Sequence, residues 1–141
     1  MASILKVDTI TGVSTAGSIA ITGEGNSTTT NLQQGLCKHW ANLNGSGTIA
    51  LRDSHNTSST TDNGTGDYTF NFTSNYNAAT YTVVGMPEGD GSGTNRLMVL
   101  HPSGTAETSS LYRVKTSDAN AGSSAGNDRS RILVNTMGDL A

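Results

Sequence analysis

The chain has 141 residues, a net charge of −3, only 13% charged residues and a single cysteine. This charge gives no reason to expect a nucleic-acid partner, and one cysteine rules out an internal disulfide. No run approaches the roughly 20 apolar residues of a membrane-spanning helix, and the N-terminal MASILKVDTITG lacks the apolar core of a secretory signal, so we expect no membrane insertion and synthesis in the cytoplasm.

Residues 1–25 are predicted to form an N-terminal β arm of two short strands, SILKVDTI and SIAIT, joined by the turn TGVSTAG. The apolar side chains of two such strands are too few to offset the entropy of ordering the segment. We therefore expect the arm to dock on other copies of the chain, on the body or on a larger assembly. The candidate contact residues are Ile4, Leu5, Val7, Ile10, Ile19 and Ile21.

Residues 26–34, NSTTTNLQQ, are polar and without period, which predicts a linker. Residues 35–141 form the body, in which short β-like bursts alternate with connections rich in Gly, Asn, Ser and Asp. This pattern predicts an all-β fold, an antiparallel sandwich or barrel that is jelly-roll-like. About seven strands are expected, at 37–43, 48–52, 67–73, 80–86, 96–101, 111–116 and 131–136, with a weak polar strand near 56–61.

Aromatic residues are the expected core of the body. Strict alternation in DYTFNFT turns Tyr68, Phe70 and Phe72 inward. We also expect Trp40 in the core, with Cys37 as a buried thiol near it. Trp40 and the tyrosines are also rings on which sugars stack, so a glycan-binding surface stays open as an alternative.

The stretch TTDNGTGDYTFNF raises the question of a cation site, because Asp62, Asn63 and Asp67 space oxygen ligands through a glycine turn. A calcium loop of the EF-hand type requires Glu at its twelfth position, which is Thr73 here. The Asn63-Gly64 pair also fits a hairpin that needs positive φ. The hairpin is therefore the preferred interpretation.

No other pattern predicts catalysis or a cofactor. His39, His55 and His101 lie on separate segments without metal-ligand spacing, although one histidine per chain could form a three-fold set in a trimer. No G-x-S-x-G elbow is present. We therefore expect a non-enzymatic protein without a cofactor or metal. Loops 87–95 and 117–128 are the candidate exposed binding loops, with Glu88, Asp90, Asn95, Asp118, Asn120 and Asn127.

Two segments carry a resemblance, ASILKVDTITG and GLCKHWANLNGSGTIALRDSHNTSSTTDNGTGDYTFNF. They resemble tail-fibre-like virion proteins of marine bacteriophages, especially those that infect cyanobacteria, over about the first 85 residues. The shared pattern reads approximately K-x-W-x-N-x-NG-x-G, then RDS-x-N-x-S, then DNGTGDY-x-x-NF. The residues that fit it are Lys38, Trp40, Asn42, Asn44, Gly45, Arg52, Asp53, Ser54, Asn56, Asp62, Asn63, Gly64, Gly66, Asp67 and Tyr68.

The resemblance implies a structural part of a bacteriophage virion, in contact with other virion proteins. The chain has no long shaft, so we expect a short fibre-like tail appendage that the arm anchors and whose body is displayed. A capsid-surface decoration protein and a module that binds a host receptor protein or glycan are alternatives, and a small depolymerase is a third. By analogy with fibre-like proteins, a homotrimer is expected.

Overall fold

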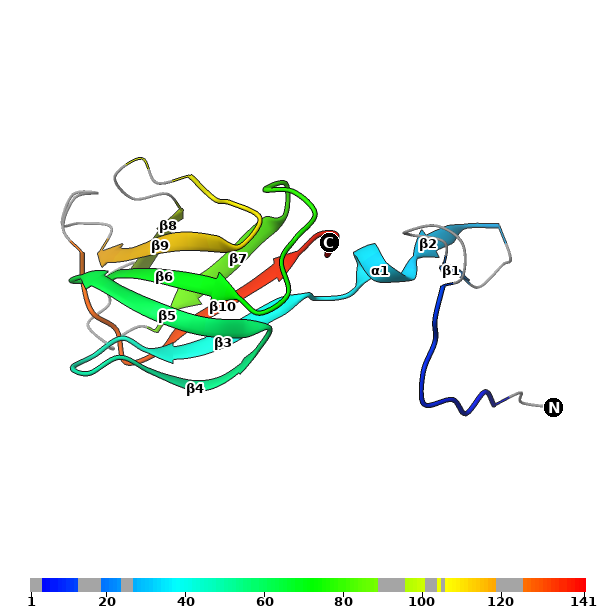
Figure 1. Ribbon diagram of the computed structural model, residues 1–141. Helices are drawn as coiled ribbons and strands as arrows, with labels where there is room; N and C mark the ends of the chain where they lie inside the picture. The colour runs from blue at the N-terminus through cyan, green and yellow to red at the C-terminus, as the bar shows by residue number, and fades with distance from the viewer. Residues whose placement is uncertain are drawn as a thin grey trace. The chain divides into compact units, whose positions relative to one another are not determined.

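The computed structural model describes residues 4–12, 19–23, 27–88, 96–100, 104, 106–118 and 126–141. The chain divides into two compact units, Met1–Leu36 and Cys37–Ala141. Each unit is a separate structural body, drawn in Figure 1.

The first unit contains a small hairpin and a helical turn. Strand β1 (Ala20–Thr22) pairs antiparallel with β2 (Thr29–Asn31), and helix α1 (Leu32–Gly35) follows directly. Asn31 caps this helix, because its Oδ1 accepts a hydrogen bond of 2.9 Å from the backbone N–H of Gln34. The segment expected to be an irregular linker therefore supplies the partner strand of β1 and a helical turn.

Residues 4–12 form no strand in the structure, although SILKVDTI was predicted to be one. The prediction rested on β-branched composition, which is only a preference, since a strand also needs a partner for its backbone N–H and C=O groups. The partner expected from the arm was SIAIT, and β1 within that segment pairs with β2 instead.

The body is a sandwich of two four-stranded antiparallel sheets (Figure 1), in the orders β4-β3-β10-β7 and β5-β6-β9-β8. The predicted all-β antiparallel sandwich is confirmed, and the described strands do not close into a barrel. The weak polar strand is a full edge strand, β5. The strands are β3 (His39–Asn44), β4 (Ala50–His55), β5 (Thr57–Gly64), β6 (Asp67–Phe72), β7 (Thr82–Pro87), β8 (Arg96–Leu100), β9 (Leu111–Asp118) and β10 (Ile132–Met137).

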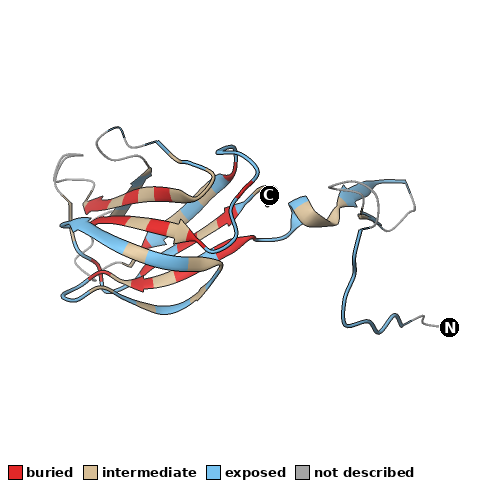
Figure 2. Ribbon diagram, in the orientation of Figure 1, coloured by how far each residue is buried: buried red, intermediate tan, exposed pale blue. Residues whose placement is uncertain are grey.

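The core lies between the two sheets, where buried residues alternate with exposed ones along the strands (Figure 2). Phe70 and Phe72 on β6 are buried as predicted, and Tyr68 joins them. Phe70 stacks on Tyr112 with the ring centroids 5.2 Å apart. The buried Tyr68 hydroxyl donates to the Gly45 carbonyl at 2.9 Å, so its burial leaves no unsatisfied donor. The apolar core is Ala41, Leu43, Tyr68, Phe70, Phe72, Tyr76, Tyr81, Tyr112, Val114, Ile132 and Val134.

Strand β3 has the facing opposite to the one predicted for its tryptophan. Trp40 points away from the core and is 39% exposed, while His39 and Leu43 on the other face are fully buried. Trp40 shares its face with Asn42 and Asn44, whose amide groups would need buried partners if this face turned inward. The expectation that Trp40 lies in the core was therefore wrong.

Cys37 is exposed, so the predicted buried thiol was also wrong. The residue precedes β3, at the start of the second unit. Its Sγ lies 3.0 Å from the carbonyl oxygen of His39. Because Cys37 stands outside the sheet ladder, strand alternation does not turn it inward with His39.

Candidate functional site

The glycine-rich loop between β5 and β6 is a tight hairpin, as its sequence predicts. Gly64 and Gly66 have φ values of +126° and +69°, which side-chain-bearing residues rarely adopt. The Gly64 N–H donates to Asp62 Oδ1 at 2.9 Å, which closes the turn. A Cβ on Gly66 would lie 2.5 Å from the backbone nitrogen of Asn127, so the loop also needs glycine for close approach.

The three side chains that could act as cation ligands, those of Asp62, Asn63 and Asp67, already have hydrogen-bond partners within the protein. Arg113 donates to both carboxylate oxygens of Asp67, through Nε at 2.7 Å and Nη2 at 2.8 Å, and this bond raises the pKa of Arg113. The Asn63 side chain donates to Thr69 Oγ1 at 2.9 Å. The three side chains are thus engaged by the β5–β6 hairpin and by β9.

We expect a chelator to leave the melting temperature of the protein unchanged, because hydrogen bonds and Arg113 hold this hairpin. Thermal unfolding with and without EDTA is the measurement. Asp62→Asn keeps an acceptor oxygen for the Gly64 N–H and should stay within about 0.5 kcal/mol of the wild type. A clear fall in melting temperature with EDTA would contradict the structural role of the loop.

Two of the predicted loop residues belong to a cluster of ion pairs and hydrogen bonds. Asp118 is the last residue of β9 and pairs with Arg96 at 3.0 Å and with Arg129. Asn127 Nδ2 donates to Asp118 Oδ2 at 3.0 Å. These side chains tie β8, β9 and the segment before β10 together, so Asp118 does not stand in an open loop.

Glu88 follows β7 directly, and its carboxylate accepts a hydrogen bond from the Ser130 hydroxyl. Of the other predicted positions, Asp90, Asn95 and Asn120 lie outside the described residues, as does His101. The two described histidines have different environments: His39 is buried in the core, whereas His55 is exposed on β4.

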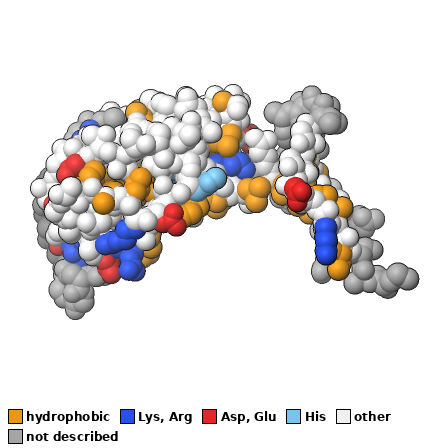
Figure 3. Space-filling model, turned by 60° about the horizontal axis from the view of Figure 1, so that its bottom comes forward, with side chains coloured by type: hydrophobic (Ala, Val, Ile, Leu, Met, Phe, Trp, Pro, Cys, Tyr) orange, Lys and Arg blue, Asp and Glu red, His pale blue; other side chains and the backbone are white. Residues whose placement is uncertain are grey.

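The candidate anchoring residues of the arm are in contact with solvent in the single chain. Ile4 and Leu5 are 78% and 81% exposed, and Val7, Ile10 and Ile21 are more than half exposed. Ile19 is half-buried, next to the β1–β2 hairpin. Hydrophobic side chains thus reach the surface of the N-terminal unit and also that of the body (Figure 3).

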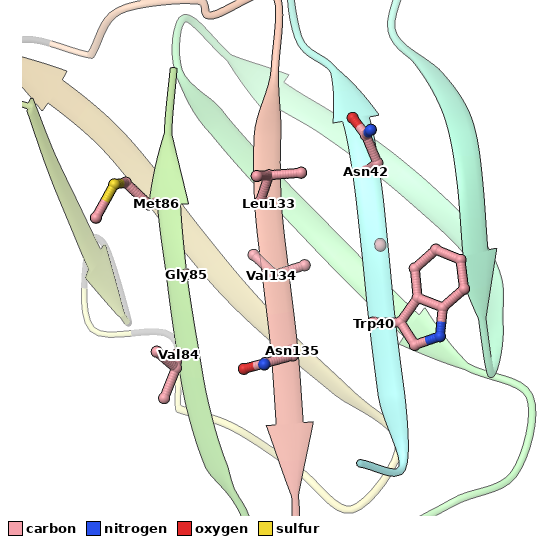
Figure 4. Close-up of a pocket in the computed structure, with 9 residues that line it drawn as sticks. Trp40, Asn42, Val84, Gly85, Met86, Leu133, Val134 and Asn135 are labelled. Atoms are coloured by element: carbon pink, nitrogen blue, oxygen red, sulfur yellow. The ribbon is translucent and has the colours of Figure 1, made fainter. Parts of the chain in front are cut away.

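On the body, apolar side chains gather on the outer face of the β4-β3-β10-β7 sheet (Figure 4). Cross-strand register aligns Trp40, Asn135 and Val84 in one row. Asn42, Leu133 and Met86 form the next row. A shallow groove of about 470 Å³ runs across them, lined by Trp40, Ala41, Asn42, Val84, Gly85, Met86, Leu133, Val134 and Asn135.

This outer face was missed in the sequence, although one signal could have indicated it. Ile132, Leu133 and Val134 are consecutive in β10, and Val83 and Val84 are adjacent in β7. A strand with one solvated face alternates apolar and polar residues, whereas a continuous apolar run is typical of a strand covered on both faces. The alternation of β6 indicates only the core-facing side of its own sheet and does not predict this outer face.

In the described ranges, no three His, Cys, Asp or Glu side chains group as metal ligands would. Helices in the same ranges are all too short or too polar to cross a bilayer.

The fold and surface define an all-β sandwich protein with an apolar outer sheet face and a separate N-terminal unit. Comparison with protein-family models, with curated proteins and with solved structures finds no match.

Proposed function

We propose that the chain is a non-enzymatic structural protein of a bacteriophage virion, a short fibre-like tail appendage. Its N-terminal arm anchors it to other virion proteins, and its body is displayed. The observation that carries this proposal is the division into a folded sandwich and a separate unit whose apolar side chains remain exposed.

The N-terminal arm carries β-branched or large apolar side chains in a segment that forms no strand, at Ile4, Leu5, Val7 and Ile10. Leaving such side chains in water forfeits about 1.5–3 kcal/mol for each that could be fully buried. An arm of this composition is stabilised most when it orders against a neighbouring protein, because strand pairing or apolar contact then buries these side chains.

The polar surface of the body is held together by ion pairs and hydrogen bonds. The carboxylates of Asp67 and Asp118 are held by arginines, and the Asp62 carboxylate closes a turn. A sandwich of this kind suits a displayed part that must stay folded without disulfides. The resemblance to tail-fibre-like virion proteins supports the same role, since its motif residues shape β3, the β3–β4 turn and the β5–β6 hairpin.

A capsid-surface decoration protein would use the same architecture in a different place. Copy number separates the two roles, because decoration requires on the order of hundreds of copies and a tail part about a dozen. Quantitative mass spectrometry of purified virions measures it. The host-binding alternative would place a receptor or glycan on the surface of the body. No feature of the described residues in loops 87–95 and 117–128 favours it.

The anchoring role predicts that a chain starting at Gly35 will fold but will not enter the particle. The sandwich core lies wholly within Cys37–Ala141, so the truncated chain keeps the contacts that stabilise the body. Incorporation is measured by immunoblotting of virions purified from cells that express the truncated chain in place of the full one.

Two full-length variants complete this experiment. Ile4→Asp with Val7→Asp should reduce incorporation, because it places charges in the proposed contact. Thr61→Ala, at an exposed position of β5, should enter virions at the normal level. Normal incorporation of the chain that lacks the arm would refute the anchoring role.

A further inference from the structure

We propose that the outer face of the β4-β3-β10-β7 sheet pairs with the same face of a second copy of this chain. The pairing is a property of the body and does not depend on the virion role. It differs from the three-fold association expected by analogy, because two like faces that meet face to face are related by a two-fold axis.

The first observation is that strands of this sheet carry apolar side chains on both faces. Val84 and Met86 on β7 are 61% and 69% exposed, and Leu133 and Met137 on β10 are also exposed. They lie opposite the inward residues of the same strands, which are in the core or packed against it. Contiguous exposed apolar side chains on a soluble protein typically mark an interaction surface.

The central strands of the β5-β6-β9-β8 sheet differ, because their outward side chains are mainly polar. Outward positions of its two central strands carry Thr69 and Asn71 on β6 and Arg113 and Lys115 on β9. Its central strands therefore have the apolar-in, polar-out pattern of a sheet with one solvated face, and the exposed apolar side chains Leu97 and Val99 are confined to its edge strand β8. In the first sheet, the central strands β3 and β10 instead place Trp40 and Leu133 outward.

Charge indicates that the occupant is a second copy. All nine residues that line the groove are uncharged, so two copies can meet there without like charges in contact. Arg131 directly precedes β10 and Glu88 directly follows β7, where the Glu88 N–H donates to the Arg131 carbonyl at 2.8 Å, and Arg52 and Asp53 lie on the edge strand β4. The rim thus has two positive and two negative side chains, which can form opposite-charge pairs with the same rim.

A saccharide is a poorer fit to the same groove. Trp40 is the only aromatic residue among the nine that line it. The most exposed side chains, Val84 and Met86, are aliphatic or thioether and offer no ring for a sugar to stack on. Interdigitating aliphatic side chains, by contrast, are how two sheets pack at about 10 Å in a sandwich.

The size of the face predicts how tightly the copies pair. Four strands at about 4.8 Å and six residues at about 3.4 Å give a face of roughly 19 by 20 Å. This is about 400 Å² in projection, a small face for a standard stable interface, which buries roughly 800 Å² of accessible surface per partner. We therefore expect a reversible, concentration-dependent dimer.

Sedimentation equilibrium of the full chain over a range of concentrations tests the pairing. The wild type should approach twice the monomer mass. Leu133→Glu places a carboxylate on each of the two apposed faces and should raise the dimer dissociation constant at least tenfold. Val99→Glu is the matched control, because Val99 is 42% exposed on β8 of the other sheet and Leu133 is 45% exposed. It should leave the dissociation constant unchanged.

Thermal unfolding of each variant shows that it is folded before its mass is interpreted. A fourth protein, Ile4→Asp, tests whether an arm covers the face in place of a second sheet, and it should dimerise like the wild type. The proposal is overturned if the wild type stays monomeric or forms a trimer, or if Leu133→Glu dimerises normally. Equal loss of dimer in Ile4→Asp and Leu133→Glu would assign the face to the arm and overturn the pairing of like faces.

Discussion

Replacement of Phe70 by alanine is expected to remove a large share of the stability of the body. Phe70 is fully buried on β6, stacked on Tyr112 and in edge contact with His39. Truncation of a buried phenylalanine costs about 3–5 kcal/mol, since the lost transfer free energy is joined by that of the cavity. Small domains have about 5–15 kcal/mol in total, so Phe70→Ala should unfold at a clearly lower urea concentration than the wild type.

Urea denaturation of wild type and variant measures this change in the free energy of unfolding. Thr61→Ala is the control in the same sheet, at an exposed position on β5 opposite Thr69, and should change stability by no more than about 0.5 kcal/mol. An unchanged midpoint for Phe70→Ala would mean that the β6 ring does not contribute to the packing between the sheets.

The success at β6 and the failure at β3 have one physical cause. In β6 one face is wholly aromatic and the other wholly polar, so only one facing buries apolar surface without burying amides. In β3 both faces mix the two kinds: His39 lies beside Ala41 and Leu43, and Trp40 lies beside Asn42. The size of its side chain alone favoured Trp40 for the core. The hydrogen-bonded His39 and the amides beside Trp40 instead decide which face of β3 turns inward.

Residues 4–12 and the outer sheet face show a second limit of sequence reasoning. Composition in residues 4–12 predicts a strand, but whether one forms depends on a partner that this chain does not provide there. The apolar run in β10 predicts two covered faces, and the single chain covers one. Both patterns fit the proposed contacts with other molecules, and the sequence of a single chain does not name those partners.

Buried His39 should make the protein less stable in mild acid. Its Nε2 is 3.0 Å from Thr57 Oγ1, and Phe72 and Tyr112 contact its ring edge to face. Burial disfavours the charged imidazolium and lowers the pKa of His39 to about 4, with a smaller contribution from His55. The unfolded chain, with an ordinary histidine pKa near 6.5, therefore binds a proton that the folded body excludes.

The direction of the pH dependence follows from this difference. The stabilising contribution of neutral His39 is complete above about pH 6.5 and is lost as the pH falls towards 4. Over this window the free energy of unfolding should fall by on the order of 3 kcal/mol, at about 1.4 kcal/mol per pH unit. The contribution of His39 is measured as the difference between the wild type and a variant that cannot titrate at this position.

His39→Gln is that variant, because glutamine keeps a donor and an acceptor near Thr57 and carries no charge at any of these pH values. Urea denaturation at several pH values between 4 and 7.5 should give a steeper fall in stability for the wild type than for His39→Gln. His55→Gln removes the exposed histidine of β4 and should retain a slope close to that of the wild type, because burial at residue 39 is the main cause of the effect. Parallel profiles for the wild type and His39→Gln would show that His39 is not held neutral by the core, and that the aromatic cluster around it admits the charged ring.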